Sequence, residues 1–219
     1  MIIARRAFTA VLSLTGLAAA IGISPFRLIA GAMAQSATAA DVAKPVSLPD
    51  MALGPTDAKV TIIEYGSLTC PHCAAFNAEV FPKIKTAYID TGKVRYVFRE
   101  FPRDPKDAAG AMLARGIAGD DCAKYFAVVD ILFRQQNEFL EKTTETLTRI
   151  GRQAGLSQQA VEACLRDQAL LDKLTADRKF AVEVLKIPGT PTFFINGEMI
   201  DGVPPYEEFD KRIKALLKI

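Results

Sequence analysis

The segment Cys70-Pro71-His72-Cys73 restricts the fold of this chain more than any other feature, because it lies where a strand pattern changes into a helix pattern. Residues 59–67, "KVTIIEYGS", form a short apolar run rich in β-branched side chains, which predicts a buried strand. From residue 71 to about residue 90, apolar side chains recur every fourth residue, which predicts a helix. A cysteine pair is therefore expected at the start of a helix that directly follows a strand.

This placement gives the first cysteine a distinct electrostatic environment. Pro71 suits the first helical position, where its missing N–H costs nothing and its φ is already helical, so Cys70 becomes the N-cap residue. The sulfur then faces unpaired backbone N–H groups and the positive end of the helix dipole, which favour a thiolate. A free cysteine has a pKa near ~8.5, and helix N-termini and CxxC motifs lower this value to roughly 3.5–7.5. A stabilised thiolate stabilises the reduced state, so the disulfide of such a pair readily accepts electrons.

His72 is the only histidine in the chain. We expect its ring or its backbone N–H to support the sulfur anion of Cys70, without acting as a base. A zinc knuckle is disfavoured because it needs four ligands, and this chain offers one CxxC, one histidine and two distant cysteines, so no metal is expected. A purely structural disulfide is also disfavoured, because the loop between Cys70 and Cys73 is too small to constrain much of the unfolded chain.

Residues 1–34 have the pattern of an export signal. Arg5 and Arg6 precede the apolar run "AVLSLTGLAAAIGI", and the small-residue sequence "AMA" ends at Ala34, where we expect cleavage. "RRAF" resembles a twin-arginine signal. Cleavage after Ala39 is a weaker alternative, and a membrane anchor is disfavoured because the apolar run is short for a span. We therefore expect a periplasmic protein.

Charge and cysteine usage agree with export. The full chain has 27 Lys and Arg against 25 Asp and Glu, and residues 1–34 hold three arginines and no acid, so the remainder has 24 against 25 and a net charge near −1. No nucleic-acid-binding surface is expected from this balance. All four cysteines lie after residue 34. Disulfides persist outside the cytosol, and an even count of cysteines favours pairing there.

The rest of the chain alternates between strand and helix patterns in an order that predicts an α/β fold. Residues 50–104 and 187–219 are expected to form a sheet domain, and residues 105–186 a helical domain inserted into it. Within this scheme we expect a linker at 35–49, a second strand at 93–101, a hairpin at 190–202 and a last helix at about 205–218. Asn196-Gly197 between two apolar runs is the strongest short signal for a hairpin turn.

These motifs resemble those of the thioredoxin superfamily, and most closely the DsbA-type thiol:disulfide oxidoreductases of alphaproteobacteria. "CPHC" is the usual active-site tetrapeptide of that family. Glu64, six residues before Cys70, matches the buried acid of its first strand, and "GTPTFFING" matches the loop that holds a cis-proline, here Pro191. The helical insertion also matches. The resemblance covers residues 50–219 and implies a thioredoxin-like fold with an inserted α-helical domain.

The resemblance implies three supporting residues for the cysteine pair. Pro191 is expected to be cis and to face the CxxC, the alternative being an ordinary trans turn proline. Thr190 precedes it, at a position that tunes sulfur reactivity in this superfamily. Glu64 is expected beneath the sulfurs, where it can relay protons to Cys73; the alternative is a solvated acid at a strand edge.

The resemblance also implies a second cysteine pair in the helical insertion. Cys122 and Cys164 are expected to form a structural disulfide, which would close a loop of about 43 residues and stabilise the fold by roughly 4 kcal/mol. In the relatives the first member of this pair sits a few residues earlier, near Gly116. The alternative is two buried free thiols that pack as small apolar residues.

The family implies a function. We expect an enzyme that introduces disulfide bonds into unfolded exported proteins with free cysteines, through the Cys70-Pro71-His72-Cys73 redox centre. A membrane protein resembling DsbB is expected to re-oxidise the pair, no further cofactor is expected, and a monomer is expected. The alternatives are a disulfide isomerase or reductase, which Thr190 favours, and a non-catalytic peptide-binding chaperone that uses the same groove.

Overall fold

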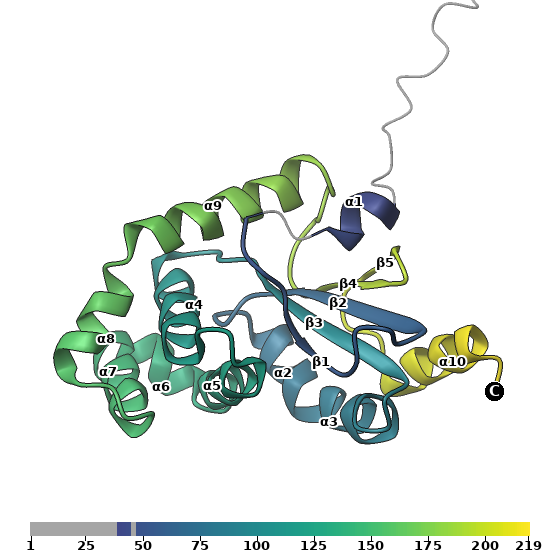
Figure 1. The fold of residues 1–219 in the computed structure, drawn as a ribbon, viewed down its shortest axis with the longest axis horizontal. Helices are drawn as coiled ribbons and strands as arrows, with labels where there is room; N and C mark the ends of the chain where they lie inside the picture. Colours follow the sequence, from purple (N-terminus) through teal and green to yellow (C-terminus); the bar gives the residue numbers. More distant parts are fainter. Residues whose placement is uncertain (1–38, 45–46) are drawn as a thin grey trace, which may run out of the picture. The chain divides into compact units, whose positions relative to one another are not determined.

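The computed structural model describes residues 39–44 and 47–219 (Figure 1). The predicted export signal, its twin-arginine pattern and the expected cleavage site near Ala34 lie outside these residues. Among the helices of the described part, none combines the length and the apolar character needed to cross a membrane.

A five-stranded mixed sheet forms the centre of the unit that comprises residues 36–219, with strand order β1-β3-β2-β4-β5. Strands β2 and β3 pair in parallel, and the other neighbours pair antiparallel. The strands are β1 (Met51–Leu53), β2 (Val60–Gly66), β3 (Val94–Glu100), β4 (Thr192–Ile195) and β5 (Glu198–Asp201).

The helices fall into three groups along the chain. Helix α1 (Ala39–Ala43) precedes the sheet, and α10 (Tyr206–Leu217) follows it. Between β2 and β3 lie α2 (Pro71–Glu79), α3 (Phe81–Ile84) and a π-helical turn η2 (Lys85–Ile89). Between β3 and β4 lie α4 (Pro105–Ala118), α5 (Cys122–Arg134), α6 (Gln136–Glu141), α7 (Thr143–Gln153), α8 (Gln158–Leu165) and α9 (Gln168–Glu183).

The sheet is buried on both faces because alternate strand residues are apolar on each side. Ile62 in β2 belongs to the larger core cluster, which includes residues of α2, α10 and the helices between β3 and β4. Ile63, next in sequence, belongs to a second cluster on the opposite face, where Val42 of α1 and Ala181 of α9 pack. Figure 1 shows α9 running back from the inserted helices across this second face toward β4.

The architecture is therefore a thioredoxin-like sheet with a helical insertion between β3 and β4, as predicted. The predicted hairpin is present as β4 and β5, joined by the two residues Asn196 and Gly197. Both have positive φ, 49° and 88°, which the tight turn between two strands requires.

One helix predicted for residues 71–90 is broken in the structure. Helix α2 ends at Glu79, and α3 begins at Phe81 after Val80, whose φ of −107° departs from helical geometry. The cause is Pro82, which has no N–H to donate to the preceding turn and whose ring crowds the carbonyl of that turn. The pattern of apolar residues continues through the break, so periodicity alone could not reveal it.

The linker predicted for residues 35–49 is wrong in its middle part, because residues 39–43 form α1. Val42 is only 1% exposed and packs in the core of the second sheet face. Strand β1 was also not predicted. It pairs antiparallel with β3, Met51 opposite Phe98, so this short segment becomes an edge strand of the sheet.

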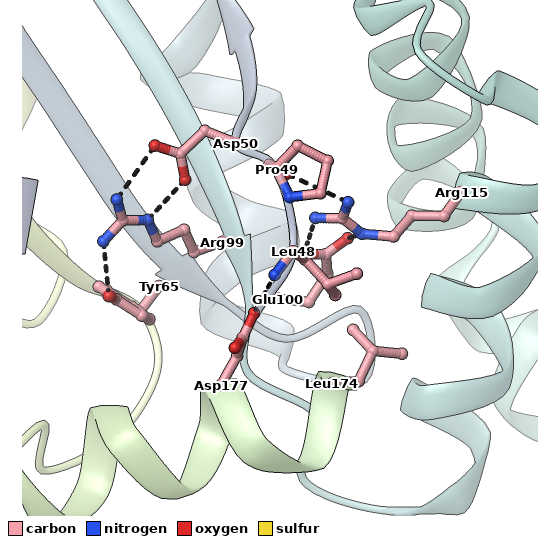
Figure 2. Close-up of a pocket in the computed structure, with 9 residues that line it drawn as sticks. All are labelled: Leu48, Pro49, Asp50, Tyr65, Arg99, Glu100, Arg115, Leu174 and Asp177. Atoms are coloured by element: carbon pink, nitrogen blue, oxygen red, sulfur yellow. Dashed lines mark hydrogen bonds and ion pairs between the residues drawn. The ribbon is translucent and has the colours of Figure 1, made fainter. Parts of the chain in front are cut away.

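Ion pairs and hydrogen bonds tie residues 42 and 47–50 to the sheet and to the insertion (Figure 2). Arg99 of β3 makes a bidentate pair with Asp50, at 2.8 and 3.0 Å, and also donates to the carbonyl of Val42 and the hydroxyl of Tyr65. Four of its five N–H groups thus donate to an acceptor.

A second pair continues this network across the insertion. Arg115 of α4 pairs with Glu100 and donates to the carbonyl of Pro49. Asp177 of α9 accepts from the backbone N–H groups of Ser47 and Leu48. The small pocket drawn in Figure 2 is lined by these paired charges and contains no nucleophile, so we assign it a structural role.

Candidate active site

The two cysteines lie at the junction of β2 and α2, as the sequence predicts. Cys70 is the N-cap residue of α2 and Pro71 occupies its first turn. Both sulfurs are free thiols in the structure, and Cys70 and Cys73 are 2% and 0% exposed. The pair is therefore largely buried, with Pro71 and His72 exposed on its outer side.

Cys70 is the acidic member of the pair. Hydrogen bonding from the thiol of Cys73 is the largest of the effects that lower the pKa of Cys70 from 9.0 to about 4, against the opposing effect of burial. Thr190 and the backbone N–H groups of Cys73 and His72 lower this pKa further. The protonated thiol of Cys70 makes no capping hydrogen bond with the start of α2. The backbone N–H groups therefore stabilise the thiolate form of Cys70 and not the thiol.

His72 contributes to this environment through its backbone. Its N–H is among the groups that lower the pKa of Cys70, while the imidazole side chain is exposed. Of the two roles considered for His72 from the sequence, the backbone role is the one that the geometry supports.

The loop before β4 faces the cysteine pair, and its proline is cis. The Thr190–Pro191 peptide bond is cis, so this prediction is confirmed. The thiol of Cys70 donates to the carbonyl oxygen of Thr190 at 3.2 Å. The hydroxyl of Thr190 is buried and has no hydrogen-bond partner among the described residues, so it is available to donate to the sulfur of Cys70 once that sulfur is an anion. That donation contributes to the lowered pKa of Cys70.

Cys73 has the opposite character. Burial is the largest cause that raises the pKa of Cys73 far above its ordinary value, followed by its hydrogen bond to Cys70 and the charge of Glu64. The backbone N–H of Ser67 points at its sulfur, at 3.5 Å. Within the pair, one sulfur favours the anion and the other favours the protonated thiol.

Glu64 is a buried acid beneath the pair, not a solvated residue at a strand edge. It is 1% exposed, and burial is the main cause that raises its pKa to about 8. The hydroxyl of Tyr96 donates to one carboxylate oxygen, Oε2, and the other, Oε1, has no hydrogen-bond partner in the part of the chain that the structure describes. Near neutral pH this carboxyl therefore holds a proton close to Cys73, whose pKa its charge affects.

The inserted helices hold the loop that precedes the cysteines. The carboxylate of Asp107 in α4 accepts from the hydroxyl of Ser67 and from the backbone N–H of Leu68. Gln136 of α6 donates to the carbonyls of Leu68 and Cys70, at 2.9 and 3.0 Å. The position of Cys70 thus depends on two helices that lie more than 30 residues away along the chain.

Sequence reasoning missed Tyr96, Asp107 and Gln136 as parts of the site. Asp107 offered a local signal, because Asp104-Pro105 is a typical helix start and places Asp107 in the first turn. Tyr96 and Gln136 gave none, because their partners are remote in sequence.

The predicted disulfide between Cys122 and Cys164 is not formed. Both are free thiols, and Cys122 Sγ lies 3.9 Å from the sulfur of Met51. Cys164 instead faces Gly116, where an added Cβ would come within 2.3 Å of Sγ. The two sulfurs therefore have different neighbours, and burial raises the pKa of Cys164, which makes it a poor nucleophile.

A surface groove opens beside Cys70 between the redox loop, the end of β3, α9 and the cis-proline loop. It combines apolar and basic side chains with the exposed face of the CxxC segment. Its lining residues are Cys70, Pro71, His72, Phe101, Arg103, Arg178, Val182, Ile187, Pro188, Gly189 and Thr190.

A low-pKa cysteine at a helix start, a buried partner thiol and a cis-proline against the first sulfur define the site of a thioredoxin-like thiol–disulfide protein. The profile of the thioredoxin family matches residues 47–215, and the chain belongs to this family, as a DsbA-like member.

Comparisons with known proteins place the chain among disulfide-exchange proteins. Disulfide bond formation protein D of Bacillus subtilis is 31% identical over 176 residues, which are 76% of each chain. A Rickettsia bellii protein, provisionally named a protein-disulfide oxidoreductase, is 39% identical over 150 residues, 68% of this chain and 57% of its own length. The chain thus spans between 53% and 57% of the rickettsial relatives it matches.

Solved structures give the same grouping. The crystal structure of Wolbachia pipientis alpha-DsbA1 superposes with a TM-score of 0.75 at 33% identity, over 83% of this chain and 96% of that one. Chlamydia trachomatis DsbA, at 18% identity and a TM-score of 0.68 over 80% of this chain and 96% of that one, shares the fold.

Proposed function

We propose that this protein is a thiol:disulfide oxidase, which introduces disulfide bonds into unfolded exported proteins in the periplasm. The observation that carries the proposal is the asymmetry of the pair: the pKa of Cys70 is lowered to about 4, while burial holds the pKa of Cys73 far above its ordinary value. A reduced site of this kind is stabilised as the Cys70 thiolate, so its disulfide is a strong oxidant.

The reaction starts from the Cys70–Cys73 disulfide. A substrate thiolate attacks Sγ of Cys70, the Cys70–Cys73 bond breaks, and Cys73 leaves with its electron pair. Glu64, whose pKa is raised to about 8, holds a proton at neutral pH and can deliver it to Cys73. The product of this step is a mixed disulfide between the substrate and Cys70.

The second step releases the oxidised substrate. A second substrate thiolate attacks the substrate sulfur of the mixed disulfide, and Cys70 leaves as a thiolate. Its low pKa makes it a good leaving group. The substrate has lost two electrons and the Cys70–Cys73 pair has gained them. A membrane protein resembling DsbB is the partner that we propose for re-oxidation, with the enzyme acting as a monomer.

The test is oxidation of a reduced, unfolded protein that contains several cysteines, together with the thiol–disulfide equilibrium of the pair against glutathione. We expect rapid oxidation and an equilibrium far toward the reduced enzyme. Cys70→Ser should abolish the reaction, and Cys73→Ser should trap the mixed disulfide. Cys164→Ser is the matched control, because it removes a cysteine that lies outside the pair and should retain activity.

The same measurements separate the alternatives. A strongly reducing potential for the pair would replace the oxidase by a reductase. Efficient reshuffling of a scrambled substrate at an intermediate potential would indicate an isomerase. Full biological function of Cys70→Ser would indicate a peptide-binding chaperone.

A further inference from the structure

The groove beside Cys70 carries a one-sided charge. Two arginines, Arg103 and Arg178, and the exposed His72 line it, and none of the described residues that line it is a carboxylate. Arg103 follows β3 and Arg178 lies on α9, so the two cations come from different elements. The apolar part of the groove is formed by Phe101, Val182, Ile187 and Pro188.

Both guanidinium groups are exposed and free of carboxylate partners within the described residues 39–44 and 47–219. Arg178 is held over the ring of Phe101, with its guanidinium carbon 5.2 Å from the ring centroid. This packing fixes its position along the groove but leaves its charge unneutralised.

The acids next to these arginines in sequence are already engaged elsewhere. Asp104 caps α4 and accepts from the hydroxyl of Thr69 and the N–H of Asp107. Asp177 accepts from two backbone N–H groups on the N-terminal segment. These carboxylates keep their charge, but none of them forms an ion pair with Arg103 or Arg178 among the described residues, so both guanidinium groups can bind an acidic ligand directly.

We propose that this groove selects substrate segments in which the reacting cysteine is flanked by aspartate or glutamate. The inference rests on the proposed oxidase function and specifies its substrate class. Unpaired cations beside the reactive sulfur attract an acidic segment and repel a basic one. They also lower the pKa of the incoming substrate thiol, which raises the fraction of the thiolate that attacks Cys70.

The test compares three dithiol peptides that differ only in the residues flanking the first cysteine, which are glutamate, glutamine or lysine. The second-order rate constant for reduction of the oxidised full-length protein is measured by rapid quenching and thiol alkylation. We expect the glutamate peptide to react about tenfold faster than the lysine peptide at low ionic strength. The difference should shrink strongly at about 1 M salt, where exposed charges are screened.

Charge reversal at the groove supplies the structural control. Arg178→Glu should reduce or invert the ratio of the two rate constants, and Arg103→Glu should act in the same direction. Lys179→Glu changes the net charge by the same amount at the next position of α9, where the exposed side chain does not line the groove. Its ratio should stay near that of the unchanged protein.

The outcomes distinguish this inference from the function on which it rests. Equal rate constants for all three peptides, with active enzyme, would overturn the charge selectivity and leave the oxidase function intact. Equal effects of Arg178→Glu and Lys179→Glu would also overturn it, because net charge rather than the groove would then be responsible. Failure to oxidise any of the peptides would overturn the oxidase function itself.

Discussion

Reduction of the cysteine pair should make the protein more stable, by an amount that depends on pH. The pKa of Cys70 is about 4 in the folded, reduced protein, against 9.0 as the ordinary value that an unfolded chain retains. Because the folded pKa is the lower one, this stabilisation is complete above about pH 9 and is lost as the pH falls through about 4. The oxidised protein has no free thiol at this position and lacks the effect.

The size of this stabilisation follows from the difference between the pH and the pKa of Cys70 in the folded protein. Each unit is worth about 1.4 kcal/mol, and near pH 7 about three units separate the pH from the pKa of Cys70, which gives about 4 kcal/mol. Solvent that reaches the groove screens part of this, so we expect about 2–4 kcal/mol. The buried carboxyl of Glu64 titrates in both redox forms, and its contribution cancels to first order in their difference.

Urea denaturation of the reduced and oxidised proteins, between about pH 4 and pH 8, measures this difference. The stability gap should widen by up to about 1.4 kcal/mol per pH unit as the pH rises from about 4. Reduced Cys70→Ser is the control and should show no such slope relative to the oxidised protein. A flat gap, or a thiolate absorbance band that appears only at alkaline pH, would refute the electrostatic account of Cys70.

Three further substitutions test other parts of the site and the fold. Thr190→Val removes a hydroxyl donor and should raise the pKa of Cys70 toward its ordinary value, which ultraviolet titration of the thiolate would reveal; an unchanged titration would show that the hydroxyl has no role. Glu64→Gln should stabilise the protein at alkaline pH. Because the pKa of Glu64 is raised from 4.5 to about 8, burying this carboxyl costs no stability below about pH 4.5 and progressively more as the pH rises to about 8. Thermal denaturation at several pH values measures this, and an unchanged melting temperature of the variant at alkaline pH would contradict it. Gly116→Ala should cost about 1–3 kcal/mol in urea denaturation because its Cβ would lie 2.3 Å from the sulfur of Cys164, and Cys164→Ala in the same chain should recover part of the loss.

The sequence predicted those parts of the fold and site that depend on neighbouring residues. The strand before Cys70, the helix start at Pro71 and the turn at Asn196-Gly197 are all local, and all three are present. The cis-proline was predicted from the resemblance rather than from local geometry.

The missed features depend on contacts between remote segments. Tyr96 donates a hydrogen bond to Glu64, which lies 32 residues earlier, and nothing in the strand pattern around Tyr96 indicates a polar partner. Cys122 and Cys164 were expected to pair because of the resemblance to the family, but pairing depends on the directions of their side chains, and both are free thiols. Cys164 faces Gly116, a glycine close to where the resemblance places the first cysteine of this pair.

The segment of residues 42–50 sets a limit on how far the chain can be shortened from its N-terminus. Deletion of the residues that precede Val42 keeps every hydrogen-bond acceptor of Arg99 in the chain. Deletion of all residues up to and including Asp50 would instead leave the buried guanidinium of Arg99 without its carboxylate partner, which should lower the free energy of unfolding by about 3–5 kcal/mol. Since domains of this size have only about 5–15 kcal/mol of stability in total, a variant cut there should be prone to unfolding even though every residue of the redox centre is intact.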